Sequence, residues 1–202
     1  MEFMDQPRWL GYPLANRVIE VMRGLMEKPS RPRMPNLLLV GDSNNGKTTI
    51  VQRFRKQYGE GYVNEDVEPV KPVVVTHAPP SADEFHSLLT GGAVKQRETM
   101  NAIKLLCNEL MIPIVGVGTQ DAVRVLHSDP QHASRFDVVA LPKWELNQEF
   151  QKLLAGFEKI LPLKHPSQLH EPQLATQLHA ISGGNFGDLH RLLIECANAA
   201  IL

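Results

Sequence analysis

One short stretch, residues 37–50 with the sequence LLLVGDSNNGKTTI, constrains this chain more than any other. The four apolar residues 37–40 predict a short buried strand, and the helical spacing of Ile50, Val51 and Phe54 predicts a helix after it. The segment between this strand and this helix contains the full pattern G-x-x-x-x-G-K-[ST]. This pattern is typical of a loop that binds the phosphates of a nucleotide. The flanking strand and helix favour this interpretation over a glycine-rich connection that binds nothing.

The residue types in the loop match what a triphosphate needs. Gly41 and Gly46 allow a tight turn that directs successive backbone N–H groups inward, and the helix from about Lys47 adds the positive end of its dipole. The Lys47 ammonium can reach the β- and γ-phosphates, and the Thr48 hydroxyl can coordinate Mg²⁺. We therefore expect ATP and Mg²⁺ as cofactors. The residues expected to bind the nucleotide in this loop are Gly41, Asp42, Ser43, Asn44, Asn45, Gly46, Lys47, Thr48 and Thr49.

Length and composition bound the remaining possibilities. A chain of 202 residues with 43% apolar content suits one α/β domain with a small helical addition. The net charge of -1 creates no overall attraction to nucleic acid, so a contact with DNA needs a local basic patch. The sequence shows neither a signal peptide nor a long apolar run, which predicts a cytoplasmic chain without membrane contact. Cys107 and Cys196 are expected to be buried free thiols rather than a disulfide.

Helical and extended patterns alternate along the first three quarters of the chain. Helices are expected at 14–27, 47–58, 93–110 and 120–127, and strands at 37–40, 73–75, 112–117 and 138–141. This alternation predicts a parallel, doubly wound α/β sheet flanked by helices. The side chains expected to be buried in the helix at 93–110 are Val94, Met100, Ile103, Leu106, Cys107 and Leu110.

The pattern changes at Leu146, where three helical segments follow one another at 146–160, 171–182 and 186–201. They predict a small all-α lid domain after the sheet. The expected division is an N-terminal segment and helix at 1–35, a nucleotide-binding α/β core at 36–145 and the helical lid at 146–202.

Hydrolysis needs an acid that holds Mg²⁺, a base for the water and a positive charge near the γ-phosphate. Asp83 and Glu84 have the form of such a pair, with Asp83 near Mg²⁺ and Glu84 activating the water; the alternative is an acidic pair at a helix N-terminus. Thr119 follows the strand at 112–117 and can orient the water, because parallel sheets bind ligands at the carboxyl ends of their strands. Its alternative role is a helix N-cap.

Basic and aromatic residues complete the candidate set. Arg135, just before the last strand, can reach the γ-phosphate of a neighbouring subunit as an arginine finger, and Arg191 in the last helix can contact the nucleotide of its own chain. Both can instead be surface salt-bridge partners. Lys95 and Arg97 are candidate contacts to DNA phosphates, or alternatively part of a solvated helix face. Tyr12 is a candidate to lie against the adenine ring, or simply to pack in the core.

Longer strings resemble one family. They are PRWLGYP, RMPNLLLVGDSNNGKTTIVQRF, IPIVGVGTQDAVRVLHSDPQHASRF and ALPKW, and they look like the TniB/TnsC group of transposition ATPases within the AAA+ superfamily. The resemblance covers nearly the whole chain. It implies a protein that binds ATP, assembles on duplex DNA as a ring or helical filament, and links target-selector proteins to the transposase. It also implies that residues 41–49 are Walker A, Thr119 sensor 1, Arg135 the finger and Arg191 sensor 2.

The sequence departs from that family before the acidic pair. In the family, a helix and an apolar strand separate the Ala-Pro-Pro segment from the Walker B acids, whereas here Asp83 follows Pro80 within three residues. Only 35 residues lie between Lys47 and Asp83. Either this is a true deletion, in which case the sheet loses its central Walker B strand and hydrolysis is in doubt, or this sequence lacks residues that the natural chain has. The alternative function is therefore a nucleotide-gated interaction module with little or no hydrolysis. A P-loop kinase of small substrates is a third hypothesis, which the helical lid and Arg135 disfavour.

Overall fold

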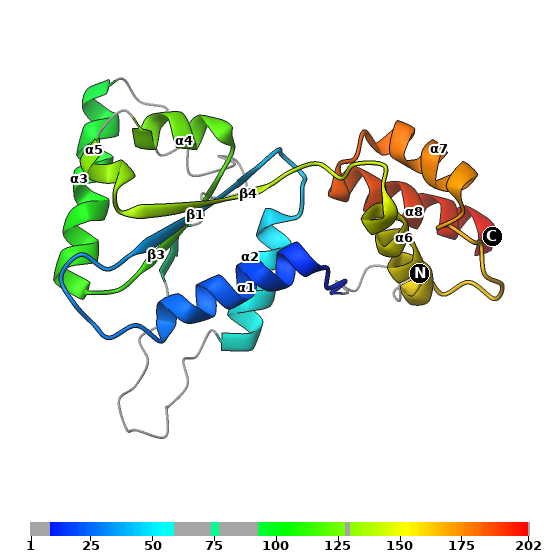
Figure 1. Ribbon diagram of the computed structural model, residues 1–202, viewed down its shortest axis with the longest axis horizontal. Helices are drawn as coiled ribbons and strands as arrows, with labels where there is room; N and C mark the ends of the chain where they lie inside the picture. Colours follow the sequence, from blue (N-terminus) through cyan, green and yellow to red (C-terminus); the bar gives the residue numbers. More distant parts are fainter. Residues whose placement is uncertain (1–8, 59–73, 77–92, 128–129, 202) are drawn as a thin grey trace. The chain divides into compact units, whose positions relative to one another are not determined.

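A computed structural model of the chain shows an α/β protein (Figure 1). The structure describes residues 9–58, 74–76, 93–127 and 130–201, with the backbone alone described at 74–76, 93–97 and 132. The chain forms two compact units. The sheet unit comprises residues 14–43 and 47–141, and the helical unit comprises residues 1–13, 44–46 and 142–202. The middle of the phosphate-binding loop thus belongs to the helical unit.

Four parallel strands form the sheet in the order β2, β3, β1, β4. They are β1 (Asn36–Gly41), β2 (Val74–Thr76), β3 (Ile114–Gly118) and β4 (Phe136–Leu141). All residues of β1 and β3 are buried, as expected for the central strands of a parallel sheet. The predicted parallel α/β sheet is confirmed.

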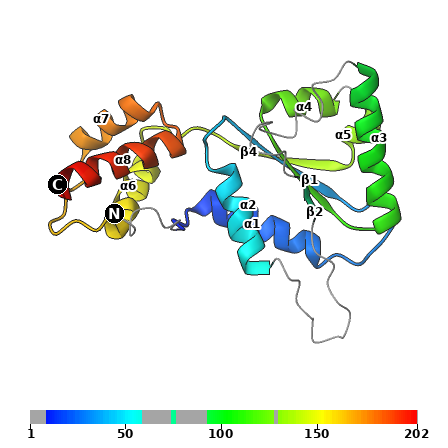
Figure 2. The ribbon, with the colours of Figure 1, turned by 180° about the vertical axis from the view of Figure 1, so that it is seen from behind.

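Helices cover both faces of this sheet. Figures 1 and 2 show α1 (Pro13–Met26) and α2 (Lys47–Tyr58) on one face. The other face carries α3 (Ala93–Leu110), α4 (Gln120–His127) and the short α5 (Pro130–Ala133), which the sequence patterns did not predict. The core beneath α3 and α4 is made of Leu38, Val40, Met100, Ile103, Cys107, Ile114, Ala122, Leu126 and Phe136.

A buried amide joins β1 to its surroundings. The Asn36 Oδ1 atom accepts hydrogen bonds from the Ile114 N–H at 2.8 Å and from the Cys107 thiol at 3.5 Å. Burial raises the pKa of the Cys107 thiol, so this group stays protonated and can donate to Asn36. The contact explains why a polar residue begins an otherwise apolar strand.

Three expectations about side chains are wrong. Leu106 and Leu110 of α3 are 51% and 47% exposed, whereas Met100, Ile103 and Cys107 are buried. Helix α3 has apolar residues on more than one face, and only one of these faces meets the sheet. Cys196 is a free thiol, as expected, but it is exposed.

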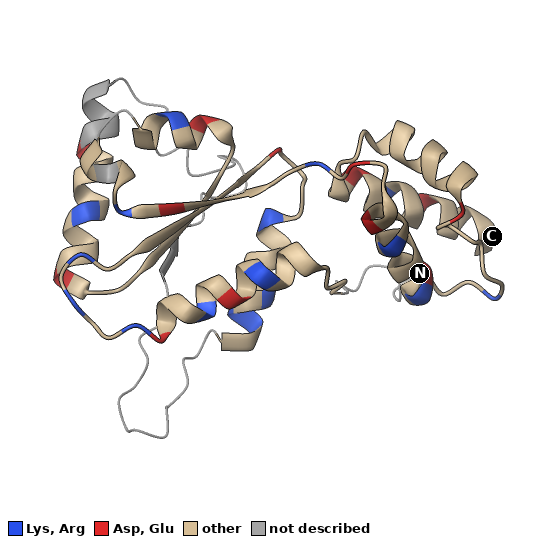
Figure 3. Cartoon of the chain, viewed as in Figure 1, with Lys and Arg blue, Asp and Glu red and all other residues tan. Residues whose placement is uncertain are grey.

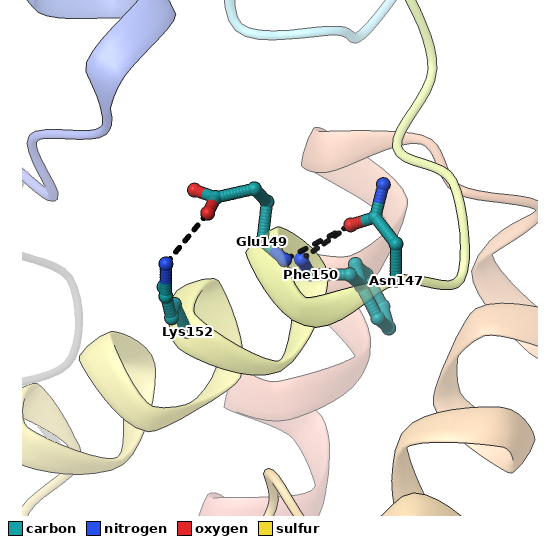
Figure 4. A network of polar contacts seen from close by, with 4 residues as sticks. All are labelled: Asn147, Glu149, Phe150 and Lys152. Carbon is teal, nitrogen blue, oxygen red and sulfur yellow. Dashed lines mark hydrogen bonds and ion pairs between the residues drawn. The ribbon is translucent and has the colours of Figure 1, made fainter.

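The helical unit contains α6 (Gln148–Ile160), α7 (Pro172–Ser182) and α8 (Phe186–Ile201). The buried face of α6 has the i, i+3, i+4, i+7 spacing of an amphipathic helix and consists of Phe150, Leu153, Leu154 and Phe157. Its start is fixed by Asn147, whose side-chain oxygen accepts from the N–H groups of Glu149 and Phe150 at 3.0 and 3.1 Å (Figure 4). Glu149 also pairs with Lys152 at 2.7 Å.

A two-glycine turn joins α7 to α8 and fixes where α8 begins. Gly183 and Gly184 have φ values of 57° and 70°, the left-handed region in which glycine carries no steric penalty. A side chain at Gly184 would collide with the carbonyl oxygen of Trp144, and the Trp144 N–H donates to the Gly184 oxygen at 2.8 Å. The same Trp144 oxygen lies 2.8 Å from His179 Nε2. These contacts fix the position of the turn that immediately precedes Phe186, the first residue of α8.

Candidate functional site

The phosphate-binding motif forms the predicted strand, loop and helix. β1 ends at Gly41 and α2 begins at Lys47, with the loop between them. Asn44 and Gly46 have φ values of 59° and 81°. These left-handed residues reverse the direction of the backbone within a few residues, as a loop that surrounds a phosphate requires.

Lys47 holds the two ends of the loop together. It is 5% exposed, and its ammonium donates to the backbone oxygens of Gly41 at 2.8 Å and Asp42 at 2.7 Å. A buried ammonium that donates to backbone carbonyls places positive charge at the loop, and an anionic ligand would be attracted to that charge. This donor set, together with the start of α2, fits a phosphate group. Thr48, the second residue of α2, is exposed and accessible to Mg²⁺.

The middle of the loop contacts the first turn of α8. The Asn44 oxygen accepts from the Gly187 N–H at 2.8 Å, and the Asn44 side-chain amide donates to Asp188 at 2.8 Å. The buried Asn45 accepts from the Phe186 N–H at 3.2 Å and donates to the oxygen of Pro142 at 3.2 Å. These contacts could not be predicted from the sequence, because they join positions more than 90 residues apart at places where the motif accepts any residue.

Thr119 lies beside the start of the loop. The parallel register pairs Val40 with Gly118, so Thr119 directly follows the residue opposite the end of β1. Its hydroxyl oxygen is buried and has no hydrogen-bond partner among the residues that the structure describes. The side chain therefore does not cap α4, and the hydroxyl at the carboxyl edge of the sheet is able to bind a ligand.

The acidic pair lies outside the described residues. Asp83 and Glu84 follow β2, whose last residue, Thr76, pairs with Gly116 of β3. Because all four strands are parallel, β2 ends at the same edge of the sheet as β1 and β3. The chain after β2 thus starts from the edge that carries the loop.

Arg135 lies at the opposite edge. It precedes Phe136, which pairs with Asn36 at the amino ends of β4 and β1, and its backbone oxygen accepts from the Asn36 N–H at 2.9 Å. Its guanidinium is partly buried and donates to Asn108 at 3.2 Å. The six residues of β1 separate this position from the loop by roughly 17 Å. Arg135 is therefore too far to reach a phosphate held by the loop of its own chain.

Arg191 lies on the exposed surface of α8. It pairs with Glu195 at 2.9 Å, and its side chain is 80% exposed. The hydrogen bond to Glu195 raises its pKa, which is already high. It lies one turn after Asp188, and side chains three residues apart share a helix face. Arg191 thus makes the surface ion pair that was its alternative role, and it shares a helix face with Asp188, which contacts the loop.

Tyr12 packs in an aromatic cluster of the helical unit. Its ring centroid lies 5.1 Å from that of Trp144 and 5.6 Å from that of Phe186, and it is 8% exposed. Phe186 in turn lies 3.2 Å from the position that a side chain at Gly46 would occupy. The cluster therefore borders the loop, although most of the Tyr12 ring is already covered by protein.

Burial of Tyr12 makes a pH dependence testable. Desolvation raises the pKa of its phenol to about 12, so folding favours the neutral form. The stabilisation is complete below the unfolded pKa of about 10 and is lost as the pH rises towards 12, by about 2 to 3 kcal/mol. Urea unfolding between pH 9 and pH 12 should show this loss, and Tyr12→Phe should reduce it. An equal loss in both proteins would contradict the assignment to Tyr12.

Basic side chains are unevenly distributed over the sheet unit. Figure 3 shows Lys and Arg but no acidic residue on α2, whose sequence is KTTIVQRFRKQY. Arg55 and Lys56 in its last turn are exposed, where they also complement the helix dipole. Lys95 and Arg97 belong to α3, but their side chains lie outside the described residues.

Within residues 9–58, 93–127 and 130–201, each helix falls short of what crossing a bilayer requires.

A parallel sheet with a glycine-rich loop and a buried lysine at its carboxyl edge defines the P-loop class of α/β proteins. The family model described as bacterial TniB protein matches residues 1–83 and 81–146. The chain therefore belongs to the TniB family, whose members are P-loop NTPase-like proteins of DNA transposition. No curated protein matches the chain significantly.

Proposed function

We propose that this chain is an AAA+ ATPase that regulates DNA transposition. It binds ATP and Mg²⁺, oligomerises on target DNA as a ring or filament, and recruits the transposase and target-selector proteins. The observation that carries this proposal is the buried Lys47 ammonium, held by Gly41 and Asp42 at the mouth of a loop of the phosphate-binding type. Membership of a transposition family supports the rest.

Each residue of the proposed site has a distinct task. Residues 41–49 bind the triphosphate, Thr48 and Asp83 hold Mg²⁺, and Mg²⁺ offsets the charge of the phosphates. Glu84 removes a proton from the attacking water and Thr119 orients that water. The unpartnered Thr119 hydroxyl supports its part in this scheme. In the proposed division, residues 1–35 lead into the nucleotide-binding core at 36–145, and residues 146–202 are the lid.

The position of Arg135 favours assembly as the active state. Its place at the amino edge of the sheet prevents a role at the loop of its own chain and suits a role at the loop of a second copy. Arg191, on the helix that contacts the loop, serves the nucleotide of its own chain. DNA phosphates are bound by basic residues repeated along the assembly, for which Lys95, Arg97, Arg55 and Lys56 are candidates.

A specific observation also favours the second candidate function, a nucleotide-gated module with little or no hydrolysis. β2 pairs directly with β3, so no strand lies between them. The family match divides into two segments that meet at residues 81–83, next to the acidic pair. Both facts agree with a chain that has lost the segment leading to the Walker B acids.

ATP turnover with and without duplex DNA tests the proposal, with Glu84→Gln as the diagnostic variant. If Glu84 is the base, the variant should bind ATP as the wild type does while its turnover falls about 100-fold or more. The matched control is Glu149→Gln, which changes an exposed acid of α6. Light scattering should show larger assemblies when ATP and DNA are added together.

The outcomes separate the two candidates. Turnover that is stimulated by DNA and lost in Glu84→Gln supports the ATPase. ATP binding and assembly without turnover in the wild type supports the nucleotide-gated module. Equal turnover in the wild type and in Glu84→Gln would exclude Glu84 as the base. Failure of the wild-type chain to bind any nucleotide would overturn both.

A further inference from the structure

We propose that the first turn of α8 acts as a clamp on the phosphate-binding loop and sets its affinity for nucleotide. The clamp consists of Phe186, Gly187 and Asp188, and it holds Asn44 and Asn45. The side chains of these two asparagines position the loop, whereas its backbone N–H groups remain for the phosphates. The inference rests on the proposed nucleotide binding and adds the device that couples it to the helical unit.

The contacts of the clamp are specific in geometry. The Gly187 N–H is shared between the Asn44 backbone oxygen at 2.8 Å and the side chain of Asn185 at 3.0 Å. Asn185 also accepts from the Asp188 N–H at 3.3 Å, so it caps α8 and fixes the donors that meet the loop. Asn44 donates to the Asp188 carboxylate, a charge-assisted bond.

The fit between the two segments leaves no spare room. A side chain at Gly187 would collide with both the backbone and the side-chain oxygen of Asn44. A side chain at Gly46 would contact the ring of Phe186 at 3.2 Å, in a backbone conformation that already favours glycine. Asn45 is 3% exposed and bonds to Phe186 on one side and to Pro142 on the other. The loop is therefore held at Asn44 and Asn45, and at Gly46 there is no room for a side chain beside Phe186.

The clamp and a phosphate use different groups of the loop. The clamp engages the carbonyl oxygen of Asn44 and the side chains of Asn44 and Asn45, and no backbone N–H of residues 44–46 donates in these contacts. A phosphate binds backbone N–H groups. The two can therefore act at once, and the clamp orders the loop before the ligand arrives. Without the clamp, the loop would become ordered only when the ligand binds, and the entropy lost in ordering it would lower the affinity.

Linkage gives this device a second consequence. If the clamp raises the affinity for nucleotide, bound nucleotide strengthens the clamp by the same factor. The first turn of α8 then responds to occupancy of the loop.

The first experiment measures the affinity for a fluorescent ATP analogue by titration with Mg²⁺ present. Gly187→Ala pushes Asn44 away, and we expect about tenfold weaker binding, or about 1.4 kcal/mol. The matched control is Gly24→Ala, which makes the same change in α1 at a position with nothing within 4 Å. Alanine is the better helix former at both sites, so helix stability alone would not weaken binding.

A double-mutant cycle isolates the side-chain bond. Asn44→Gly suits the left-handed backbone, and Asp188→Ala removes the partner; each should weaken binding three- to tenfold. The double variant should bind the analogue no more weakly than the single variant with the lower affinity, because each substitution removes the same Asn44–Asp188 hydrogen bond. Glu149→Ala is the control, since it removes a first-turn acid from α6 of the same unit.

The second experiment needs no variant. Hydrogen exchange of the Phe186 and Gly187 amides in the wild-type chain should slow about tenfold when nucleotide saturates the loop. Affinities of the clamp variants within twofold of the controls, or exchange unchanged by bound nucleotide, would overturn the clamp and leave the proposed function intact. If the wild-type chain binds no nucleotide, the proposed function itself fails, which a titration of the wild type reveals first.

Discussion

Lys47→Ala is expected to weaken ATP binding by roughly 100-fold or more, or about 2.7 kcal/mol. The Lys47 ammonium is the buried positive charge at the site, and its two bonds to Gly41 and Asp42 also hold the ends of the loop together. The variant thus loses the positive charge that pairs with the phosphates, and it also loses the two hydrogen bonds that hold the ends of the loop together. Titration of the fluorescent ATP analogue measures the loss.

The control for this variant is Lys152→Ala. Lys152 is an exposed lysine of α6 that pairs with Glu149, so its removal changes the net charge equally without touching the loop. We expect its affinity to lie within twofold of the wild type. A loss below threefold in Lys47→Ala would contradict the assignment of the loop as the nucleotide site, even if the chain still assembles on DNA.

Phe150→Ala is expected to destabilise the helical unit by about 3 to 5 kcal/mol. The Phe150 side chain is 0% exposed in the centre of the α6 face, and its ring meets His179 edge-on with centroids 5.2 Å apart. Truncation leaves a cavity and removes this contact, while the backbone bond to Asn147 remains. A loss of this size approaches the total stability of many domains.

Urea unfolding followed by tryptophan fluorescence measures this effect selectively. Both tryptophans of the chain, Trp9 and Trp144, belong to the helical unit, so their emission reports on that unit. Ile181→Ala is the control, because Ile181 lies on α7 and is 69% exposed; its effect should stay within about 0.5 kcal/mol. A Phe150→Ala change below 1 kcal/mol would show that the centre of the unit can collapse around the missing ring.

The sequence was most informative where a local rule determines the structure. The motif at 41–48 predicted the end of β1 and the start of α2, because its glycines and its lysine leave few other conformations. The predicted strand at 112–117 instead runs from Ile114, since Pro113 has no N–H to donate to a neighbouring strand. The predicted strand at 138–141 begins at Phe136, where pairing with Asn36 extends it.

Side-chain environments depended on partners that a sequence does not identify. The apolar residues of α3 cover more than one face, and periodicity alone did not tell which face would meet the sheet. The contacts of Asn44 and Asn45 join the loop to residues 97 to 144 positions away. Only the folded chain brings these residues together, so the clamp could not be derived from the motif.

If Arg135 enters the loop of a second copy, as proposed, the opposite locations of the loop and Arg135 restrict the symmetry that copies of this chain can adopt. A contact that joins the carboxyl edge of one sheet to the amino edge of the next is heterologous, because the two copies use different surfaces. A two-fold axis therefore cannot relate these two copies. Repetition of such a contact gives either a closed ring or a polar fibre. In a fibre, one terminal copy presents a loop with no arginine supplied to it, and the other presents an arginine with no loop to enter. The two ends of the fibre would then differ chemically, and growth and shortening could proceed from different ends.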